Sequence, residues 1–272
     1  MVRGGARALT RGFGLDGGAM TGAQKPLPGG CGTASGAVPG PATKTVAWHR
    51  SGGLVAYPDA LAAMDLRARQ VREGTASEFL WFLEHPPLYT AGTSAADNEL
   101  LTPERFPVFR TGRGGRFTYH GPGQRVAYAV LDLRRPGPPD VRRYVQTLEA
   151  WLIAALGRLG VTGERRTGRI GIWVKTPSGE AKIAALGVRI SRWITTHGIA
   201  LNVDPDLSHF AGIVPCGIAE YGVTSLKALG VEADMAEVDD VLCASFEETF
   251  NARLVPADDP PTDAGRLQTV GI

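Results

Sequence analysis

The sequence has few cysteines, little net charge and no long apolar run, and each shortage argues against a class of protein. Three of its 272 residues are cysteine, and no two of them share a C-x-x-C spacing. A disulfide framework, a structural zinc site and a CxxC redox motif are therefore not indicated, and we expect a reducing compartment, the cytoplasm. The net charge of +2 gives no case for nucleic acid as a partner. No apolar stretch approaches the roughly 18–20 residues that cross a bilayer, so we expect no membrane partner.

Both ends of the chain lack bulky apolar residues. Residues 1–44 are rich in Gly, Ala, Thr and Pro with Asp16 as their only acid, and residues 256–272 are rich in Pro, Asp and Gly. Such segments bury too little apolar surface to fold. We expect a disordered tail or an over-extended start over 1–44, with a targeting segment as the alternative, and a flexible tail over 256–272. The stretch 45–255 has no repeat and no linker, which predicts one catalytic domain.

Hydrophobic periodicity within 45–255 predicts a mixture of helices and strands. Apolar residues recur at helical spacing after Pro58, from Val141 to Leu159 behind a capping Asp140, and from Met235 to Phe250. Compact apolar runs predict strands over 78–85, 125–133 and 196–203, and 168–190 reads as two strands joined by a Pro-Ser-Gly turn. We therefore expect an α/β fold, α+β-like in having a mixed or mainly antiparallel sheet.

Two stretches have more glycine, histidine or isolated charge than a scaffold needs. In "RTGRGGRFTYHGPGQ", Gly114 and Gly115 let backbone N–H groups approach an anion or a carbonyl oxygen, and His120 follows a short β-prone run. A glycine-rich hairpin with a surface histidine would give the same pattern. In "EAKIAALGVRI", Lys182 opens an otherwise apolar strand. It is either a lysine that reaches water from the strand end or a partly buried ammonium beside a thiol.

Cys216 stands between Pro215 and Gly217, where it is either a small apolar residue at a turn or a reactive thiol. A thiol with the ordinary pKa near ~8.5 is only slightly ionised at neutral pH. A nearby lysine ammonium favours the thiolate, and lowering the thiol pKa by about two units takes about 2.7 kcal/mol. A Lys–Cys pair of this kind can transfer acyl groups through a thioester. Cys243, in the last predicted helix, is expected to be inert packing, and Cys31 has no expected role.

Five separated motifs resemble those of the lipoyl(octanoyl) transferase family: "LEHPPLYTAGTSA", "RGGRFTYHGPGQ", "KIAALGVRI", "WITTHGIALNV" and "FAGIVPCGI". The resemblance covers roughly residues 46 to 250 and leaves out the N-terminal tail. It implies the fold of the biotin/lipoate protein ligase catalytic domain, with the sheet as one wall of an acyl tunnel. It also implies an acyltransferase that moves an octanoyl group from acyl carrier protein to a lysine of lipoyl domains or of the glycine cleavage H protein. No cofactor and no metal are implied.

The resemblance further implies residue roles. Cys216 would form the acyl thioester, and Lys182 would favour its thiolate and exchange protons with it. A backbone N–H near Cys216 or in the Gly-Gly loop would hold the thioester oxygen. Arg116 and Phe117 occupy a variable pair, so Arg116 is either a cation that meets acidic carrier proteins or a solvated residue. The acyl site would be lined by Arg113, Gly114, Gly115, Arg116, Phe117, Thr118, Tyr119, His120, Ala185, Leu186, Gly187, Gly198, Ile199 and Ala200.

Three other functions fit parts of this pattern. An ATP-dependent lipoate or octanoate ligase shares the fold and a similar loop, but it activates its acid as an adenylate and needs no cysteine nucleophile. A non-catalytic module that binds lipoyl domains would not need Lys182 and Cys216. A Cys/His thioesterase would use water in place of the amine. Trapping an acyl-enzyme and testing ATP and acceptor dependence separate these alternatives.

Overall fold

A computed structural model of the protein describes residues 44–135, 137–214, 222–258 and 260. Cys31 and Cys216 lie outside the described residues. Within the described part, the helices are α1 (Tyr57–Glu73), α2 (Val141–Arg158) and α3 (Met235–Phe250), with short 3-10 turns at Asp97–Glu99, Leu207–Gly212 and Lys227–Leu229. The predicted α/β fold with a mixed sheet is confirmed.

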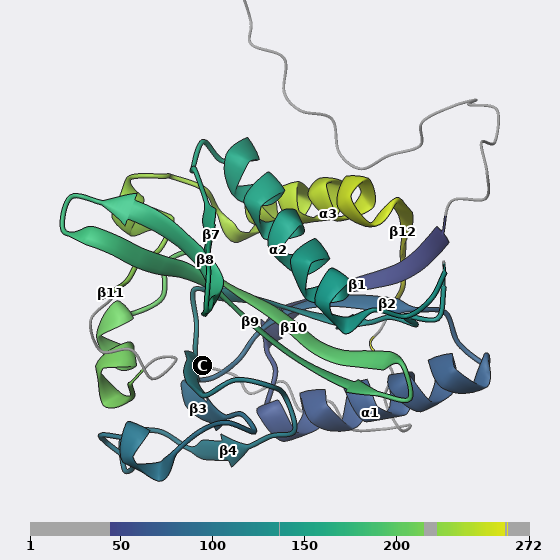
Figure 1. The fold of residues 1–272 in the computed structure, drawn as a ribbon, viewed down its shortest axis with the longest axis horizontal. Helices are drawn as coiled ribbons and strands as arrows, with labels where there is room; N and C mark the ends of the chain where they lie inside the picture. The colour runs from purple at the N-terminus through teal and green to yellow at the C-terminus, as the bar shows by residue number, and fades with distance from the viewer. Residues whose placement is uncertain (1–43, 136, 215–221, 259, 261–272) are drawn as a thin grey trace, which may run out of the picture. The chain divides into compact units, whose positions relative to one another are not determined.

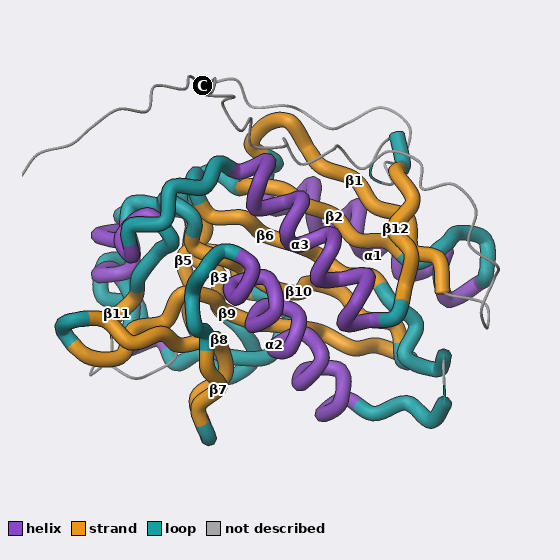
Figure 2. The backbone as a smooth tube through the Cα atoms, turned by 90° about the horizontal axis from the view of Figure 1, so that it is seen from above, coloured by secondary structure: helices purple, strands orange, loops and turns teal. Residues whose placement is uncertain are grey.

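A nine-stranded sheet is the centre of the fold, in the order β12-β1-β2-β6-β10-β9-β8-β7, with β11 paired to β9. Strand β1 runs parallel to both β2 and β12, whereas β2, β6, β10, β9 and β8 pair antiparallel in turn. Figures 1 and 2 show β9 and β10 as a long hairpin through the sheet. The strands are β1 (Lys44–Leu54), β2 (Phe79–Glu84), β6 (Gln124–Val130), β7 (Glu164–Arg166), β8 (Arg169–Thr176), β9 (Gly179–Ser191), β10 (Ile194–Asn202), β11 (Gly222–Val223) and β12 (Ala252–Pro256).

A separate three-stranded sheet lies at one end of the large one, in the order β4-β3-β5. Its strands are β3 (Leu88–Ala91), β4 (Val108–Arg110) and β5 (Phe117–His120). Strand β5 leads through a tight turn, closed by the bond from the Gln124 N–H to the Gly121 carbonyl, into β6, so the small sheet positions the glycine-rich loop that precedes β5.

The helices cover both faces of the large sheet, α2 and α3 on one face and α1 on the other (Figure 1). Helix α2 begins where the sequence predicted, because the Asp140 carboxylate accepts the backbone N–H groups of Arg142 and Arg143 at 2.8 and 3.1 Å. Val141, predicted on its buried stripe, is 43% exposed and is the first residue of the helix. None of the described helices combines the length and apolar character needed to span a membrane.

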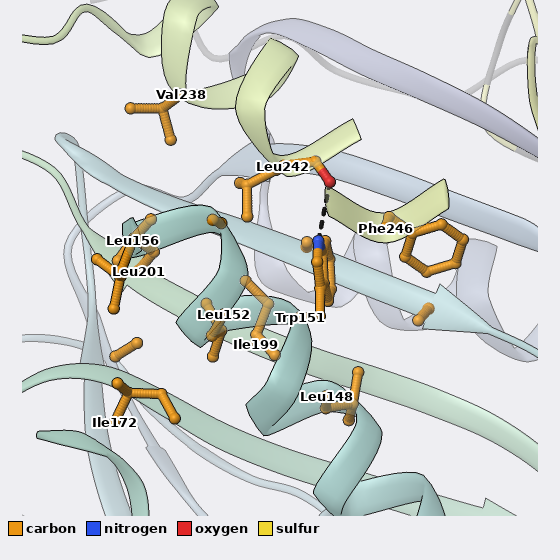
Figure 3. Packing of buried hydrophobic residues seen from close by; sticks show 14 of the residues in the cluster. Leu148, Trp151, Leu152, Leu156, Ile172, Ile199, Leu201, Val238, Leu242 and Phe246 are labelled. Atoms are coloured by element: carbon orange, nitrogen blue, oxygen red, sulfur yellow. Dashed lines mark hydrogen bonds between the residues drawn. The ribbon is translucent and has the colours of Figure 1, made fainter. Parts of the chain in front are cut away.

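The main core lies between α2, α3 and the sheet (Figure 3). Leu148, Leu152 and Trp151 are fully buried there, and the Trp151 indole N–H donates to the Leu242 carbonyl at 2.8 Å. This bond satisfies the one polar atom of the ring and fixes α2 against α3. Cys243 is half-buried against the same core, as expected of inert packing.

A buried ion pair joins α3 to the strands beneath it. Asp239 is fully buried and accepts from Arg125 of β6 at 3.1 Å and from Arg50 of β1 at 3.3 Å. Arg125 is only 3% exposed, so its charge depends on this carboxylate for compensation. The packing of α3 on the sheet is therefore charge-dependent as well as apolar.

Candidate active site

A cavity of about 460 Å³ with a mainly apolar lining opens beside β9. Strand β8 pairs with β9 only as far as Ala184, so, among the residues that the structure describes, no strand pairs with the next residues of β9 on that side. Helix α2 contributes Val145 and Leu148 to the wall, and the loop before β5 contributes Arg113 to Arg116. The following predicted site residues line this cavity: Lys182, Arg113, Gly114, Gly115, Arg116, Phe117, Thr118, His120, Ala185, Leu186, Gly187, Gly198, Ile199 and Ala200.

The glycine-rich loop is pinned to its neighbours through backbone hydrogen bonds. Gly114 N–H donates to the Val188 carbonyl at 2.9 Å, and Ser94 N–H donates to the Gly115 carbonyl at 3.0 Å. Gly115 has φ +91°, a conformation that a side chain would strain. The Gly114 N–H is thus occupied within the protein, and the expectation that a backbone N–H of this loop or near Cys216 holds the thioester oxygen stays a prediction.

Arg113 stabilises the loop through hydrogen bonds on its buried side. Its guanidinium is buried and donates to the Thr90 carbonyl at 2.8 Å, the Thr90 hydroxyl at 2.6 Å and the Gly114 carbonyl at 3.0 Å. A β-carbon on Gly187 would lie 2.8 Å from Arg113 Cδ, so a glycine there lets the arginine pass between loop and strand. Arg113 therefore places a fixed positive charge at the cavity wall.

One predicted residue is placed differently from the expectation. Tyr119 is not among the lining residues, and its ring packs against Phe106 and Phe210. Its hydroxyl bonds to His209 Nδ1 at 2.7 Å instead. Arg116 lines the cavity, and its half-exposed guanidinium pairs with the buried carboxylate of Glu99, while its meeting with acidic carrier proteins stays a prediction.

Lys182 is 6% exposed, although it opens its strand in the sequence pattern. Its ammonium donates to the Ile170 carbonyl at 2.9 Å and lies 4.9 Å from the centroid of the Trp173 ring, a cation–π distance. Strand β11 pairs with β9 at this position, with Val223 opposite Lys182. The chain segment that follows the undescribed residues therefore begins beside the Lys182 backbone.

The residues on both sides of the undescribed segment 215–221 are tied to the cavity wall. On one side, Val214 N–H donates to the carbonyl of Glu99 at 2.8 Å, and Glu99 pairs with cavity-lining Arg116. On the other side, Thr224 N–H donates to the Lys182 carbonyl at 2.9 Å. Cys216 belongs to the segment between these two anchors.

Histidine and tyrosine rings fill one end of the cavity. His197 lines it from β10 with φ +63°, and burial together with the charges of Arg113 and Arg189 lowers its pKa to about 3. Burial lowers the pKa of His85, behind the lining, to about 4. Both rings are therefore neutral at pH 7. In the described part of the chain, no cluster of three or more His, Cys, Asp or Glu residues could hold a metal ion.

Several lining residues were not predicted from the sequence. Tyr57 and Tyr128 reach the cavity from α1 and β6, and Val145 and Leu148 reach it from α2. Helical periodicity marked the last two as inward-facing but does not separate a cavity wall from a packed core. Only their spatial proximity to the glycine-rich loop identifies them.

The chain is similar in sequence to known proteins over most of its length. The lipoyl protein ligase A/B catalytic domain matches residues 56–247. An octanoyltransferase from Paramagnetospirillum magneticum is 62% identical over 208 residues, which cover 76% of this chain and 98% of that protein. One from Acidiphilium cryptum is 59% identical over 219 residues, covering 79% and 96%. The chain belongs to the octanoyltransferase family. The family expected from the five motifs is confirmed.

Solved structures with this fold are more distant in sequence. A bipartite lipoate protein ligase from Thermoplasma acidophilum superposes with a TM-score of 0.60 at 18% identity, covering 81% of this chain and 88% of that one. A lipoate-protein ligase A bound with ATP also gives 0.60, at 17% identity, covering 79% and 89%. The predicted likeness to the lipoate ligase catalytic fold is confirmed. At these identities the likeness concerns the fold alone.

Proposed function

We propose that this protein transfers an octanoyl group from acyl carrier protein to a lysine of lipoyl domains or of the glycine cleavage H protein, in the cytoplasm. Membership of the octanoyltransferase family makes it an acyltransferase. The observation that carries the finer proposal is the buried Lys182 ammonium on the wall of an apolar cavity, next to the strand that follows Cys216. The proposed donor, acceptor and nucleophile all depend on this arrangement.

The size and apolar lining of the cavity suit a medium acyl chain. Burial of a methylene contributes about 0.8 kcal/mol, so the seven carbons beyond an octanoyl carbonyl contribute on the order of 5 kcal/mol. A cavity of about 460 Å³ falls within the ordinary range for small-molecule sites. Chain-length preference then follows from how many methylenes the cavity accommodates.

The proposed reaction has two halves, and neither needs ATP. The Lys182 ammonium favours the Cys216 thiolate, whose sulfur attacks the donor carbonyl. The bond between that carbonyl and the phosphopantetheine sulfur breaks, and the carrier thiol leaves with a proton. The acceptor lysine then attacks the Cys216 thioester as a neutral amine. An amide forms, the carbon–sulfur bond to Cys216 breaks, and the amine proton returns through the enzyme to the thiol.

Intact-protein mass spectrometry after incubation with octanoyl carrier protein tests the proposal. We expect a mass gain of one octanoyl group, located on Cys216 and discharged by an acceptor domain. Cys216→Ser is expected to prevent turnover, and Lys182→Ala to slow acylation, with the exposed Lys227→Ala as a matched control that leaves both steps unchanged. Wild-type turnover by Cys216→Ser would rule out the thioester.

The ATP-dependent ligase is not favoured, because the close relatives are named octanoyltransferases. Octanoate with ATP in place of the acyl carrier gives the decisive comparison. Product formed under those conditions would favour the ligase. Discharge of the acyl-enzyme to water at the same rate without acceptor would favour a thioesterase.

A further inference from the structure

A chain of buried polar side chains runs from the cavity wall to the strand beside Lys182. His120 Nδ1 lies 2.7 Å from Gln124 Oε1, Gln124 Nε2 lies 2.9 Å from Asn202 Oδ1, and Asn202 Nδ2 lies 2.9 Å from the Thr224 carbonyl. All four residues are at least nine-tenths buried. Buried polar groups of this kind are costly unless every partner is satisfied, so each hydrogen must be in a defined place.

The Thr224 carbonyl, at one end of this series of hydrogen bonds, decides which group donates and which accepts in each bond. The Thr224 carbonyl can only accept, so Asn202 must present its NH₂ group there and its oxygen to Gln124. Gln124 must then donate from its NH₂ group, which also donates to the Tyr119 carbonyl at 3.3 Å. The backbone carbonyls of Thr224 and Tyr119 thus fix the orientations of the Asn202 and Gln124 side-chain amides. The Gln124 oxygen faces His120, and His120 Nδ1 must carry the proton.

The other ring nitrogen of His120 is left as an acceptor. The ring lines the cavity, and within the described part of the chain Nε2 has no hydrogen-bond partner. The charged and titratable groups around the ring are Arg113 from the glycine-rich loop, His85 after β2 and His197 from β10. Burial, reinforced by these groups, holds the pKa of His120 well below its usual range. The ring is therefore neutral at pH 7, with a lone pair on Nε2.

In the proposed reaction, the acyl chain that enters the cavity has no N–H or O–H group that could donate to His120 Nε2. The acceptor amine must lose a proton as it attacks the thioester. We propose that Gln124 and Asn202 are positioning residues for this second half-reaction, and that they hold His120 with Nε2 ready to accept an N–H of the attacking lysine. This inference rests on the proposed function. It assigns Lys182 to the thiol half-reaction and His120 to the amine half-reaction.

The tautomer is measured directly on the wild-type protein. Nitrogen NMR of the ¹⁵N-histidine-labelled protein is expected to give His120 a protonated Nδ1 and an unprotonated Nε2 at neutral pH. A His120→Gln spectrum assigns the signal. The opposite tautomer, or a charged ring, would overturn the inference whatever the enzyme's activity.

The kinetic test uses Gln124→Glu, which keeps the oxygen that faces Nδ1 but places a negative charge beside the ring. An adjacent carboxylate favours the protonated ring, which can no longer accept through Nε2. We expect the acid limb of the acyl-enzyme discharge rate to move upward by about one pH unit or more, so that the variant loses rate on the acid side and recovers it as the pH is raised. The rate of Cys216 acylation is expected to stay unchanged.

Thr195→Val is the matched control. Thr195 lies on β10, and its buried hydroxyl bonds to the backbone groups of Leu131 and Ala129, but it does not line the cavity. It is expected to lower stability without moving the pH profile. An unchanged profile for Gln124→Glu, in a folded protein that still forms the acyl-enzyme, would overturn the positioning role. A wild-type protein that forms no acyl-enzyme would instead overturn the proposed function, and the tautomer measurement would still stand.

Discussion

Replacing Gly114 by alanine is expected to slow acylation of Cys216 while leaving the stability of the protein nearly unchanged. Gly114 lines the cavity, and a β-carbon built on it would meet nothing closer than the Val188 carbonyl at 3.7 Å, an ordinary contact. The protein therefore tolerates the methyl group. Only a bound substrate, which approaches the bare backbone, would be displaced by it.

The expected size of the effect follows from catalytic geometry and backbone conformation. A displacement of the reacting carbonyl by about 1 Å can cost on the order of 10²-fold in rate. Alanine at a compatible position changes the free energy of unfolding by less than about 1 kcal/mol. Gly115→Ala is the matched comparison, because φ is +91° there and a side chain costs roughly 1–2 kcal/mol in that region.

The assay combines two measurements on both variants. Rapid quenching and mass spectrometry give the rate constant for octanoyl transfer to Cys216, and thermal unfolding gives Tm. For a domain of this size about 1 kcal/mol corresponds to about 2–4 °C, so Gly115→Ala is expected to melt lower and Gly114→Ala to melt like the wild type. If Gly114→Ala acylates at the wild-type rate, the loop does not approach the substrate and the reasoning fails.

Three further predictions concern stability, each measured by urea unfolding. Because His85 is held neutral with a pKa of about 4 and takes up a proton near pH 6.5 once unfolded, it is expected to contribute about 2 kcal/mol to the fall in the free energy of unfolding from pH 7.5 to pH 5, in addition to the contributions of His197 and His120; a fall smaller by about that amount in His85→Gln checks the assignment. Asp239→Ala is expected to cost about 3–5 kcal/mol by leaving Arg125 uncompensated, whereas Arg125→Met with Asp239→Leu should recover most of that loss. Trp151→Phe is expected to cost about 1 kcal/mol or more, since it removes the N–H that bonds to α3; no loss would show that this bond contributes nothing.

Local physics was enough to predict most of the fold. Asp140 predicted the start of α2 because a carboxylate at that position satisfies two free N–H groups, and the predicted bonds are present. The run "FLWFLE" predicted the buried strand β2. Strand β1 was missed, because "KTVAWHRSGGL" mixes polar residues and glycines, and it becomes a strand through its pairing with β2 and β12.

The sequence predicted those site residues that belong to short motifs with unusual chemistry. Lys182 was singled out because a cation inside an apolar strand is unusual, and the structure places it in the cavity wall. Tyr119 was assigned to the cavity, but its ring packs against Phe106 and Phe210 instead. The link from Gln124 to Asn202 joins residues 78 positions apart, so no local pattern could reveal it. The meeting of Lys182 and Cys216 stays a prediction.

The pairing of β1 with β12 has a consequence for how the chain is made. On the ribosome, each residue of β1 emerges more than two hundred residues before the residue of β12 that pairs with it. Until Ala252–Pro256 leaves the exit tunnel, one edge of β1 presents unpaired backbone groups to other nascent chains. Sheets closed by such distant segments form slowly, because loop closure must precede the contacts that reward it. We therefore expect the newly made chain to need a chaperone that covers this edge of β1 until β12 pairs with it.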